Sequence, residues 1–369
     1  MQQYRLEFFN RNTLSYVHHD FSENLAIDDD YLSASTTVIE IGATNLVKKG
    51  QFIRILRDDS DYFFGVVTDS EPGEYVTRVS FKPFITIFNE EFVFNALFQH
   101  YGDLQHSLEN TLKHYIDTIY TNTTDTYQKL PISVTVPSSE SNHTKTWNFG
   151  LEGDTDGLSA TVIDMYNVLI VNALKKYGVA IEVIPDFANK QIDLKIGKQT
   201  GTVYLDADLD NVTVKTLKCS DMPTGTNKLE VYNSNNYTDV EVYYVHPYGH
   251  DPLWDDDGSS DRLSPVIRGI KTAAPDLDAT PPITFEMAAL LAAYDEFSGI
   301  EWDNLIELEV APNDPLVNPS RLKIGQTVTV YYKSNSYTSI LTGKAISFET
   351  VTLIFGSERI QYSKRKTSK

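Results

Sequence analysis

Residues 50–80 read GQFIRILRDDSDYFFGVVTDSEPGEYVTRVS, and residues 325–355 read GQTVTVYYKSNSYTSILTGKAISFETVTLIF. The two segments align without a gap when the numbering is shifted by 275. Each has a Gly-Gln turn, a strand, a polar turn, a strand led by tyrosine, and a last strand. Two short β meanders can resemble each other by chance, but the long shared register favours an internal repeat.

Matched residue types recur along this register. The pairs are Gly50 with Gly325, Gln51 with Gln326, Tyr62 with Tyr337, Val66 with Leu341, Glu74 with Glu349, Val76 with Val351, and Val79 with Ile354. Glycine suits a turn because it accepts positive φ without steric cost. Upstream, residues 38–41 (Val-Ile-Glu-Ile) also resemble residues 305–308 (Leu-Ile-Glu-Leu). The chain is therefore expected to contain two copies of one β unit.

The whole chain is expected to be a β-rich α+β protein of several domains. Its 369 residues exceed one ordinary core, and tyrosine (22) and phenylalanine (18) are abundant, which favours strands. We expect two tube-like antiparallel β-barrels related by the repeat, an α/β domain and a smaller insert. The predicted bounds are 1–98 for the first β-barrel, 99–208 for the α/β domain, 209–246 with 300–369 for the second β-barrel, and 247–299 for an insert with one helix.

Hydrophobic periodicity predicts the individual elements. Strands are expected at 4–9, 37–41, 52–56, 62–67, 75–81, 130–136, 179–184, 191–196, 212–217, 229–232 and 240–245. Helices are expected over 104–120 and over 158–177, the second ended by Gly178 as a C′ glycine. A third helix should follow Thr284 as its N-cap. Its predicted apolar side consists of Met287, Leu290, Leu291, Tyr294 and Phe297.

The formal net charge of −20 limits the classes of partner. Gripping nucleic acid needs clustered Lys and Arg, whereas an acidic channel wall would let DNA slide past without sticking. The one dense basic run, Lys364, Arg365, Lys366 and Lys369, is interpreted as a solvated terminus. Cys219 is the single cysteine, so no intrachain disulfide can form. We expect no signal peptide and no membrane span, since no apolar run is long enough.

A search for chemistry finds clusters but no site, so we assign no catalytic, cofactor-binding or metal-binding residues and expect no enzyme. His246, His250 and Asp251 are residue types of a zinc site, but Pro247 and Gly249 make this a loop. The acidic set Asp251, Asp255, Asp256, Asp257 and Asp261 lacks the EF-hand frame and is interpreted as a solvated loop, not a calcium site. His18-His19-Asp20 has no recognisable nucleophile beside it, and Cys219 is interpreted as a buried small hydrophobe.

Several stretches resemble the hub module of siphophage tail-associated (Tal) proteins. They are FIRI at 52–55, YFFGVV at 62–67, LIELEV at 305–310, LKIGQ at 322–326, YTSILTG at 337–343 and TLIFG at 352–356. The resemblance covers most of the chain and is weakest at 121–157 and 247–282. These motifs are structural and contain no catalytic residues.

The resemblance implies a fold similar to that of the myophage baseplate hub. Three chains, each with two similar barrels, would form a ring around a lumen, and DNA would pass without specific binding. The implied partners are two further copies of the chain, the hexameric distal tail protein, and either the tape measure protein or downstream tail-fibre proteins. The implied location is the virion tail tip or baseplate, after assembly in the host cytoplasm, with no membrane anchor and no cofactor.

Two other functions stay open from the sequence. A carbohydrate- or receptor-binding tail module is suggested by the tyrosine content and the acidic loops, and it would bind glycans measurably. A cell-wall hydrolase would need two carboxylates facing each other across a cleft. Many members of the resembled family carry a hydrolase or a fibre after the second barrel. This sequence stops just after that barrel, so hydrolase activity is not expected.

Overall fold

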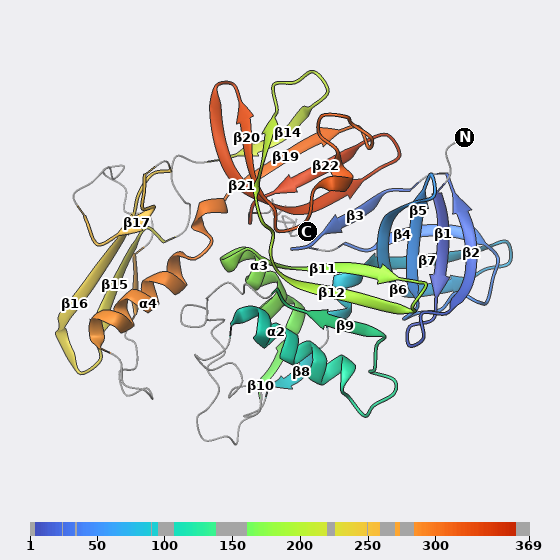
Figure 1. Cartoon of the computed structure of the whole chain (residues 1–369), viewed down its shortest axis with the longest axis horizontal. Coiled ribbons are helices and arrows are strands. Elements are labelled where there is room, and N and C mark those ends of the chain that lie inside the picture. The colour runs from blue at the N-terminus through green and yellow to red at the C-terminus, as the bar shows by residue number, and fades with distance from the viewer. Residues whose placement is uncertain are drawn as a thin grey trace, which may run out of the picture.

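The computed structural model describes residues 4–23, 25–33, 35–89, 91–94, 107–137, 161–219, 226–248, 250–258, 270–273 and 284–358. Two curled sheets, each a half-barrel, lie side by side, with an α/β unit beneath them and a smaller helix-and-sheet unit at one end (Figure 1). Most of the regular structure is strand, which confirms the predicted β-rich fold.

The first half-barrel has the strand order β2-β1-β5-β6-β7-β4 and is antiparallel throughout. Its strands are β1 (Tyr4–Phe9), β2 (Tyr16–Ser22), β4 (Thr37–Gly42), β5 (Phe52–Arg57), β6 (Ser60–Pro72) and β7 (Val76–Pro83). The five strands predicted before residue 98 are thereby confirmed. Alternate side chains face inward, as in β4, where Ile39 and Ile41 are buried and Val38 and Glu40 are exposed.

The second half-barrel has the order β13-β20-β21-β22-β19-β14, and β3 pairs with β21 beside this path. Its strands are β3 (Ile27–Asp30), β13 (Thr202–Asp206), β14 (Thr213–Lys218), β19 (Leu305–Val310), β20 (Thr327–Tyr332), β21 (Asn335–Ile346) and β22 (Val351–Phe355). Buried residues of both half-barrels form one continuous hydrophobic cluster, which includes Ile27 of β3. The two copies are therefore joined by a shared core as well as by the chain.

The repeat is present in three dimensions, because β5-β6-β7-β4 and β20-β21-β22-β19 have the same order and directions. Gly50 and Gly325 both have positive φ, at 87° and 84°. Both hairpins turn on two consecutive residues with positive φ, Asp58-Asp59 and Lys333-Ser334, as a type I′ turn requires. These turn residues coincide under the shift of 275, which confirms the repeat up to this point.

Beyond the hairpin turn the ungapped alignment is wrong by one residue. Tyr62 is an extra residue in β6, because the pairing jumps from Ile55 opposite Phe63 to Leu56 opposite Asp61. The second hairpin pairs without such a bulge. Val67 is therefore equivalent to Leu341, since each exchanges hydrogen bonds with the matching Gly-Gln turn. Tyr62 is not the counterpart of Tyr337, because a β-bulge absorbs one residue without changing the strand order.

The upstream match also shifts, by two residues. Ile39 pairs with Val79 in the first copy, and Leu308 pairs with Leu353 in the second. Residues 38–41 are therefore equivalent to 307–310 and not to 305–308. The two-residue error in the alignment leaves the same residues on the apolar face, because side chains alternate along a strand with a period of two. Composition alone could not distinguish the two registers.

The α/β unit contains a three-stranded sheet in the order β11-β12-β9 and its covering helices. Its elements are η1 (Phe84–Phe88), β8 (Glu91–Phe94), α2 (Leu108–Ile116), η2 (Asp117–Thr121), β9 (Ile132–Thr135), β10 (Thr161–Asp164), η3 (Met165–Ile170), α3 (Val171–Tyr177), β11 (Val179–Asp186) and β12 (Gln191–Lys198). The predicted hairpin after Gly178 is confirmed, and Gly178 is left-handed with φ 66°.

The predicted helix over 158–177 begins later than expected. Residues 161–164 form β10, paired with β8, while residues 158–160 lie outside the described part of the chain. Asp164 then caps the helical turn by accepting a hydrogen bond from the backbone N–H of Asn167. Three β-branched residues followed by a capping aspartate explain the change from strand to helix at this point.

The end unit is a four-stranded sheet in the order β17-β16-β15-β18, covered by one helix. Its elements are β15 (Lys228–Asn233), β16 (Asn236–Val245), β17 (Trp254–Asp255), β18 (Ile270–Ala273) and α4 (Phe285–Phe297), followed by η4 (Ile300–Trp302). The short helix η5 (Pro319–Arg321) belongs to the second half-barrel region. β15 and β16 were predicted within the second barrel, and β13 within the α/β domain. Strand pairing corrects both placements, while the domain division as a whole stays a prediction.

Helix α4 begins at Thr284 as predicted, since Thr284 Oγ1 accepts a hydrogen bond from the N–H of Met287 at 3.3 Å. Its predicted apolar side is confirmed at Phe297, which is buried, and at Leu290, which packs against the same cluster, but it is wrong at Met287 and Tyr294. Ala288, Ala289, Ala293 and Phe297 are buried, whereas Met287 and Tyr294 are exposed. Small alanines let the helix approach β15 and β16 closely, so the largest apolar residues need not mark the inner face. Across the described ranges, the helices are too short or too polar to cross a membrane.

Candidate functional site: an acidic groove between the half-barrels

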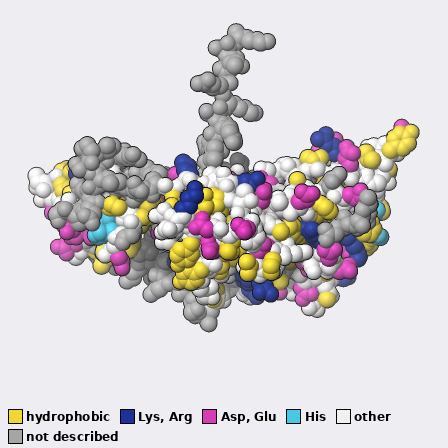
Figure 2. Space-filling view, turned by 90° about the horizontal axis from the view of Figure 1, so that it is seen from above, with side chains coloured by type: hydrophobic (Ala, Val, Ile, Leu, Met, Phe, Trp, Pro, Cys, Tyr) yellow, Lys and Arg dark blue, Asp and Glu magenta, His cyan; other side chains and the backbone are white. Residues whose placement is uncertain are grey.

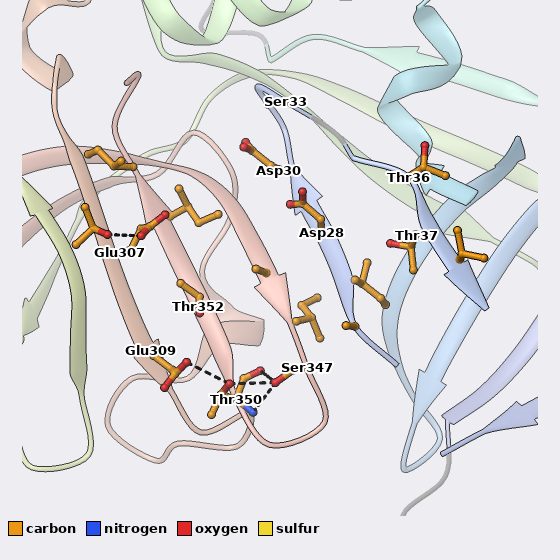
Figure 3. Close-up of a pocket in the computed structure, with 18 residues that line it drawn as sticks. Asp28, Asp30, Ser33, Thr36, Thr37, Glu307, Glu309, Ser347, Thr350 and Thr352 are labelled. Atoms are coloured by element: carbon orange, nitrogen blue, oxygen red, sulfur yellow. Dashed lines mark hydrogen bonds between the residues drawn. The ribbon is translucent and has the colours of Figure 1, made fainter. Parts of the chain in front are cut away.

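A groove of about 1010 Å³ lies on the outward face of the second half-barrel, beside the segment that leads from β3 into β4 (Figure 3). Its main wall is a single sheet face, because β14, β19, β22, the end of β21 and β3 are paired in that order. Its far wall is formed by Ser33 and by Thr36, Thr37 and Val38 at the start of β4. The lining residues are Ala26, Ile27, Asp28, Asp30, Ser33, Thr36, Thr37, Val38, Thr216, Leu305, Glu307, Glu309, Ala345, Ile346, Ser347, Thr350, Thr352 and Ile354. Among these described lining residues none is lysine or arginine.

Strand periodicity directs two glutamates into the groove. On β19, Ile306, Leu308 and Val310 point into the core, so Glu307 and Glu309 point to the opposite face. Glu307 accepts a hydrogen bond from the hydroxyl of Thr216 on β14. The groove wall is therefore a polar sheet face backed by a fully apolar core.

Glu309 is held at the other end of this wall. Its Oε2 atom lies 3.1 Å from Nζ of Lys215, and it also accepts a hydrogen bond from Thr350 Oγ1 at 3.5 Å. The Lys215 side chain is 47% exposed, so this pair lies at the solvent-facing rim. Exposed pairs of this kind are weak, typically below about 1 kcal/mol.

The β3 edge of this sheet face depends on the pairing of β3 with β21. Gly343 pairs with Asp30, and Lys344 pairs with Asp29. A Cβ atom at residue 343 would lie 2.9 Å from the Cα atom of Asp30, so only glycine permits this approach. Beyond β3, the N–H of Leu32 donates to Asp30 Oδ1 at 3.0 Å. These contacts direct Asp28 and Asp30 toward the groove (Figure 3).

The segment after β3 is anchored in the α/β unit by Tyr31. Its hydroxyl oxygen accepts a hydrogen bond from the N–H of Ile181 at 3.1 Å, and its carbonyl accepts one from the Tyr166 hydroxyl at 2.8 Å. Burial raises the pKa of the Tyr31 hydroxyl above its usual range. Because β3 and Tyr31 contact different units, this short segment ties the first half-barrel to the other two.

Asp29 and Lys344 form a charged pair behind the groove. Lys344 Nζ donates to the carbonyls of Pro319 at 2.7 Å and Leu322 at 2.8 Å, which fixes the turn before β20. Burial raises the pKa of Asp29 to about 6, against an opposing effect of the Lys344 charge. Burial likewise lowers the pKa of Lys344, and Asp29 opposes that shift. For both groups, loss of hydration outweighs the attraction of the partner.

The histidine cluster considered for zinc lies in the end unit, far along the chain from the groove strands. His246 is buried, and its Nε2 atom lies 2.8 Å from Asp255 Oδ1. The His250 ring packs against it with a centroid distance of 4.2 Å and an angle of 34° between the ring planes. Where residues are described, no three His, Cys, Asp or Glu side chains are grouped to hold a metal ion.

The acidic loop considered for calcium is described only in part. Asp255 Oδ1 also accepts a hydrogen bond from the N–H of Asp257 at 2.8 Å, which is a local turn contact. Asp261 lies outside the described residues. The interpretation of this loop as solvated stays a prediction.

The remaining sequence candidates have structural partners. Asp20 accepts hydrogen bonds from the N–H groups of Gly42 at 2.6 Å and Phe21 at 2.7 Å, so it links β2 to β4. His19 contacts the hydroxyl of Tyr16 on the same strand. Cys219 is partly buried, and burial raises the pKa of its thiol to about 11, which keeps it protonated at neutral pH.

The groove carboxylates were not predicted as a site. Asp28 and Asp30 are far in sequence from Glu307 and Glu309, and the pairing of β3 with β21 places all four on one sheet face. One sequence signal was available, namely the alternation of Glu307 and Glu309 with apolar residues, which shows that β19 has a polar face.

Comparison of the coordinates with solved structures gives long alignments at low identity. A 43 kDa tail protein of prophage MuSo2 from Shewanella oneidensis aligns over 96% of both chains, with 13% identity and a TM-score of 0.50. The chain has the fold of a prophage tail protein. A tail protein of Neisseria meningitidis MC58 aligns over 96% of both chains, with 10% identity and a TM-score of 0.49.

A chain of the activated phage P2 baseplate aligns over all of that chain and 98% of this one, with 14% identity and a TM-score of 0.45. No protein-family model and no curated protein sequence matches the chain. The tail-protein fold therefore rests on the three-dimensional comparison with the MuSo2 protein. It agrees with the hub resemblance seen in the sequence.

Proposed function

We propose that this chain is a structural baseplate hub protein of a phage tail tip, of which three copies form a ring that closes or extends the tail tube. The observation that carries the proposal is the pair of matching half-barrels in one chain, joined by a continuous core. The likeness to the MuSo2 tail protein over 96% of both chains supports the same class of function.

The repeat suits a symmetry mismatch in the tail. Three chains with two similar half-barrels each present six similar units, so the ring can dock on a six-fold distal tail ring while remaining three-fold itself. The tape measure protein or tail-fibre proteins are candidates for the opposite side. The formal charge of −20 favours a lumen through which DNA passes without binding.

Light scattering after gel filtration, followed by electron microscopy, tests the ring. A trimer would have about 125 kDa, three times the 41.7 kDa chain, and class averages should show a three-fold ring. Mixing with the distal tail protein hexamer of the same phage should give a stacked complex. A stable dimer or tetramer, or a chain that stays monomeric with the hexamer present, would refute the trimeric hub.

A carbohydrate- or receptor-binding module is the second candidate, favoured by one observation. Tyr204 on β13 and Tyr331 on β20 are exposed and stacked, with ring centroids 6.3 Å apart and planes 22° apart. Stacked, exposed aromatic rings can pack against the apolar face of a sugar. A glycan array on the wild type and a Tyr204→Ala/Tyr331→Ala variant tests this, and binding that the variant loses would favour it.

The hydrolase alternative has a structural counterpart to examine, because the groove carries four carboxylates, all on one sheet face. Glu307 and Glu309 are hydrogen-bonded to neighbouring side chains of their own sheet. We infer that these carboxylates shape a charged surface. Purified protein should release no soluble fragments in a cell-wall turnover assay, and release abolished by Glu307→Gln would overturn this inference.

A further inference from the structure

The groove between the half-barrels has an acidic surface and an open side, so it suits a basic occupant. Asp28 and Asp30 on β3 and Glu307 and Glu309 on β19 give its sheet face four carboxylates. Lys215 at the rim pairs with Glu309. Asp28 lies in the same cross-strand row as Glu309, and Asp30 in the same row as Glu307, three strands apart in each case. Several carboxylates on one face attract a polycationic segment more strongly than an isolated surface charge does.

The chain itself supplies a basic segment next to this groove. After β22 the backbone passes Trp302 and Asn304, because the N–H of Ser357 donates to the Trp302 carbonyl at 2.9 Å and the N–H of Glu358 donates to the Asn304 carbonyl at 3.2 Å. The next residue, Leu305, lines one end of the groove. The backbone at Glu358 therefore lies beside the groove end.

The sequence of this segment complements the groove. Residues 359–369 read RIQYSKRKTSK and contain five basic residues and no acidic residue. Eleven extended residues span up to roughly 36 Å, whereas the groove wall along β19, from Leu305 to Glu309, is only about 14 Å long. The segment can therefore reach the whole groove with length to spare.

We propose that the basic segment 359–369 docks in the acidic groove of its own chain and crosses the sheet face from β19 to β3. Lysine or arginine side chains would pair with carboxylates of both strands, while Tyr362 and Ile360 would cover Ile354 and Leu305. The docked segment would brace β3 against the other strands of its sheet, reinforcing the pairing of β3 with β21. This inference does not depend on the hub function.

Carbodiimide cross-linking of the full chain, read by peptide mass spectrometry, tests the docking directly, because this reagent joins lysines to carboxylates already in ion-pair contact. Links from Lys364, Lys366 or Lys369 to the peptides of β3 or β19 are expected at low salt. Salt at 0.5 M should reduce them about fivefold or more, because the Debye length is then well below 8 Å.

Two variants with the same charge change provide the comparison. Glu307→Gln/Glu309→Gln should remove the links to β19 and weaken those to β3. Asp69→Asn/Glu71→Gln on β6, outside the groove, should leave all links unchanged. Glutamine keeps the hydrogen bond with Thr216, and circular dichroism checks that both variants fold.

A mixture of ¹⁴N- and ¹⁵N-labelled chains separates the possible occupants. Links between two peptides of the same isotope support the proposal. A predominance of links between a ¹⁴N peptide and a ¹⁵N peptide would place the segment in the groove of another copy and overturn it. Absence of links, or links that persist equally in the Glu307→Gln/Glu309→Gln variant, would also overturn it. A Lys364→Gln/Arg365→Gln/Lys366→Gln variant should show faster hydrogen exchange of residues 26–38, and unchanged exchange there would contradict the proposed effect.

Discussion

Asp29→Asn should change how the stability of the protein depends on pH. Burial raises the pKa of Asp29 to about 6 from an ordinary value of 3.8. A carboxyl whose pKa is higher in the folded state than in the unfolded state stabilises the fold when it is protonated. This stabilisation is complete at pH values below the unfolded-state pKa and is lost as pH rises through the folded-state pKa. The wild-type protein should therefore gain stability from Asp29 as pH falls from about 7 to about 4.

The size of this effect follows from the pKa difference. At about 1.4 kcal/mol per pKa unit, the shift corresponds to at most about 3 kcal/mol. Asp29 is partly exposed and faces the ammonium of Lys344, so solvent screening reduces the expected value to about 1–2 kcal/mol. Asparagine mimics the protonated carboxyl, so the variant should lack this part of the pH dependence.

Urea unfolding followed by circular dichroism at pH 7, 6, 5 and 4 measures the difference between the two proteins. The variant should be more stable than the wild type at pH 7, and the difference should shrink by about 1–2 kcal/mol toward pH 4. Asp59→Asn, at an exposed turn position that accepts asparagine equally, is the control and should leave the pH profile unchanged. Parallel profiles for Asp29→Asn and the wild type would refute the reasoning.

Three further predictions concern the joints of the fold and the acidic loop. Gly343→Ala should destabilise the chain by about 1–3 kcal/mol and speed hydrogen exchange in β3, because the added Cβ has no room against that strand; unchanged β3 exchange would contradict the close approach. Phe297→Ala should cost the end unit about 3–5 kcal/mol by local hydrogen exchange, while Met287→Ala on the exposed face of the same helix should cost less than about 1 kcal/mol. Calcium at about 5 mM, which saturates sites of the extracellular type, should leave the melting temperature unchanged. A rise that Asp255→Asn/Asp257→Asn abolishes would show that the loop at 251–261 binds the ion.

Features that depend on neighbouring residues were predictable from the sequence. The glycine turn at Gly50, the cap at Thr284 and the helix end at Gly178 each follow from the φ or hydrogen bond that one residue type supplies. The repeat was detectable because both hairpins need the same turn and the same alternation. The one-residue error after Tyr62 arose because a bulge changes pairing without changing the residue pattern.

The choice of partner for each strand was decided only in the tertiary structure. β15 and β16 have the same alternating character as the barrel strands, yet they pair with each other and are covered by α4. β3 lies between strands of the first half-barrel in sequence, yet it completes the second. Any strand with one apolar face can form its backbone hydrogen bonds with many other strands. The choice of partner therefore depends on which arrangement buries the most apolar surface. The acidic groove exists because that arrangement adds β3 to the edge of the sheet that contains β19, so that the polar faces of both strands line one surface.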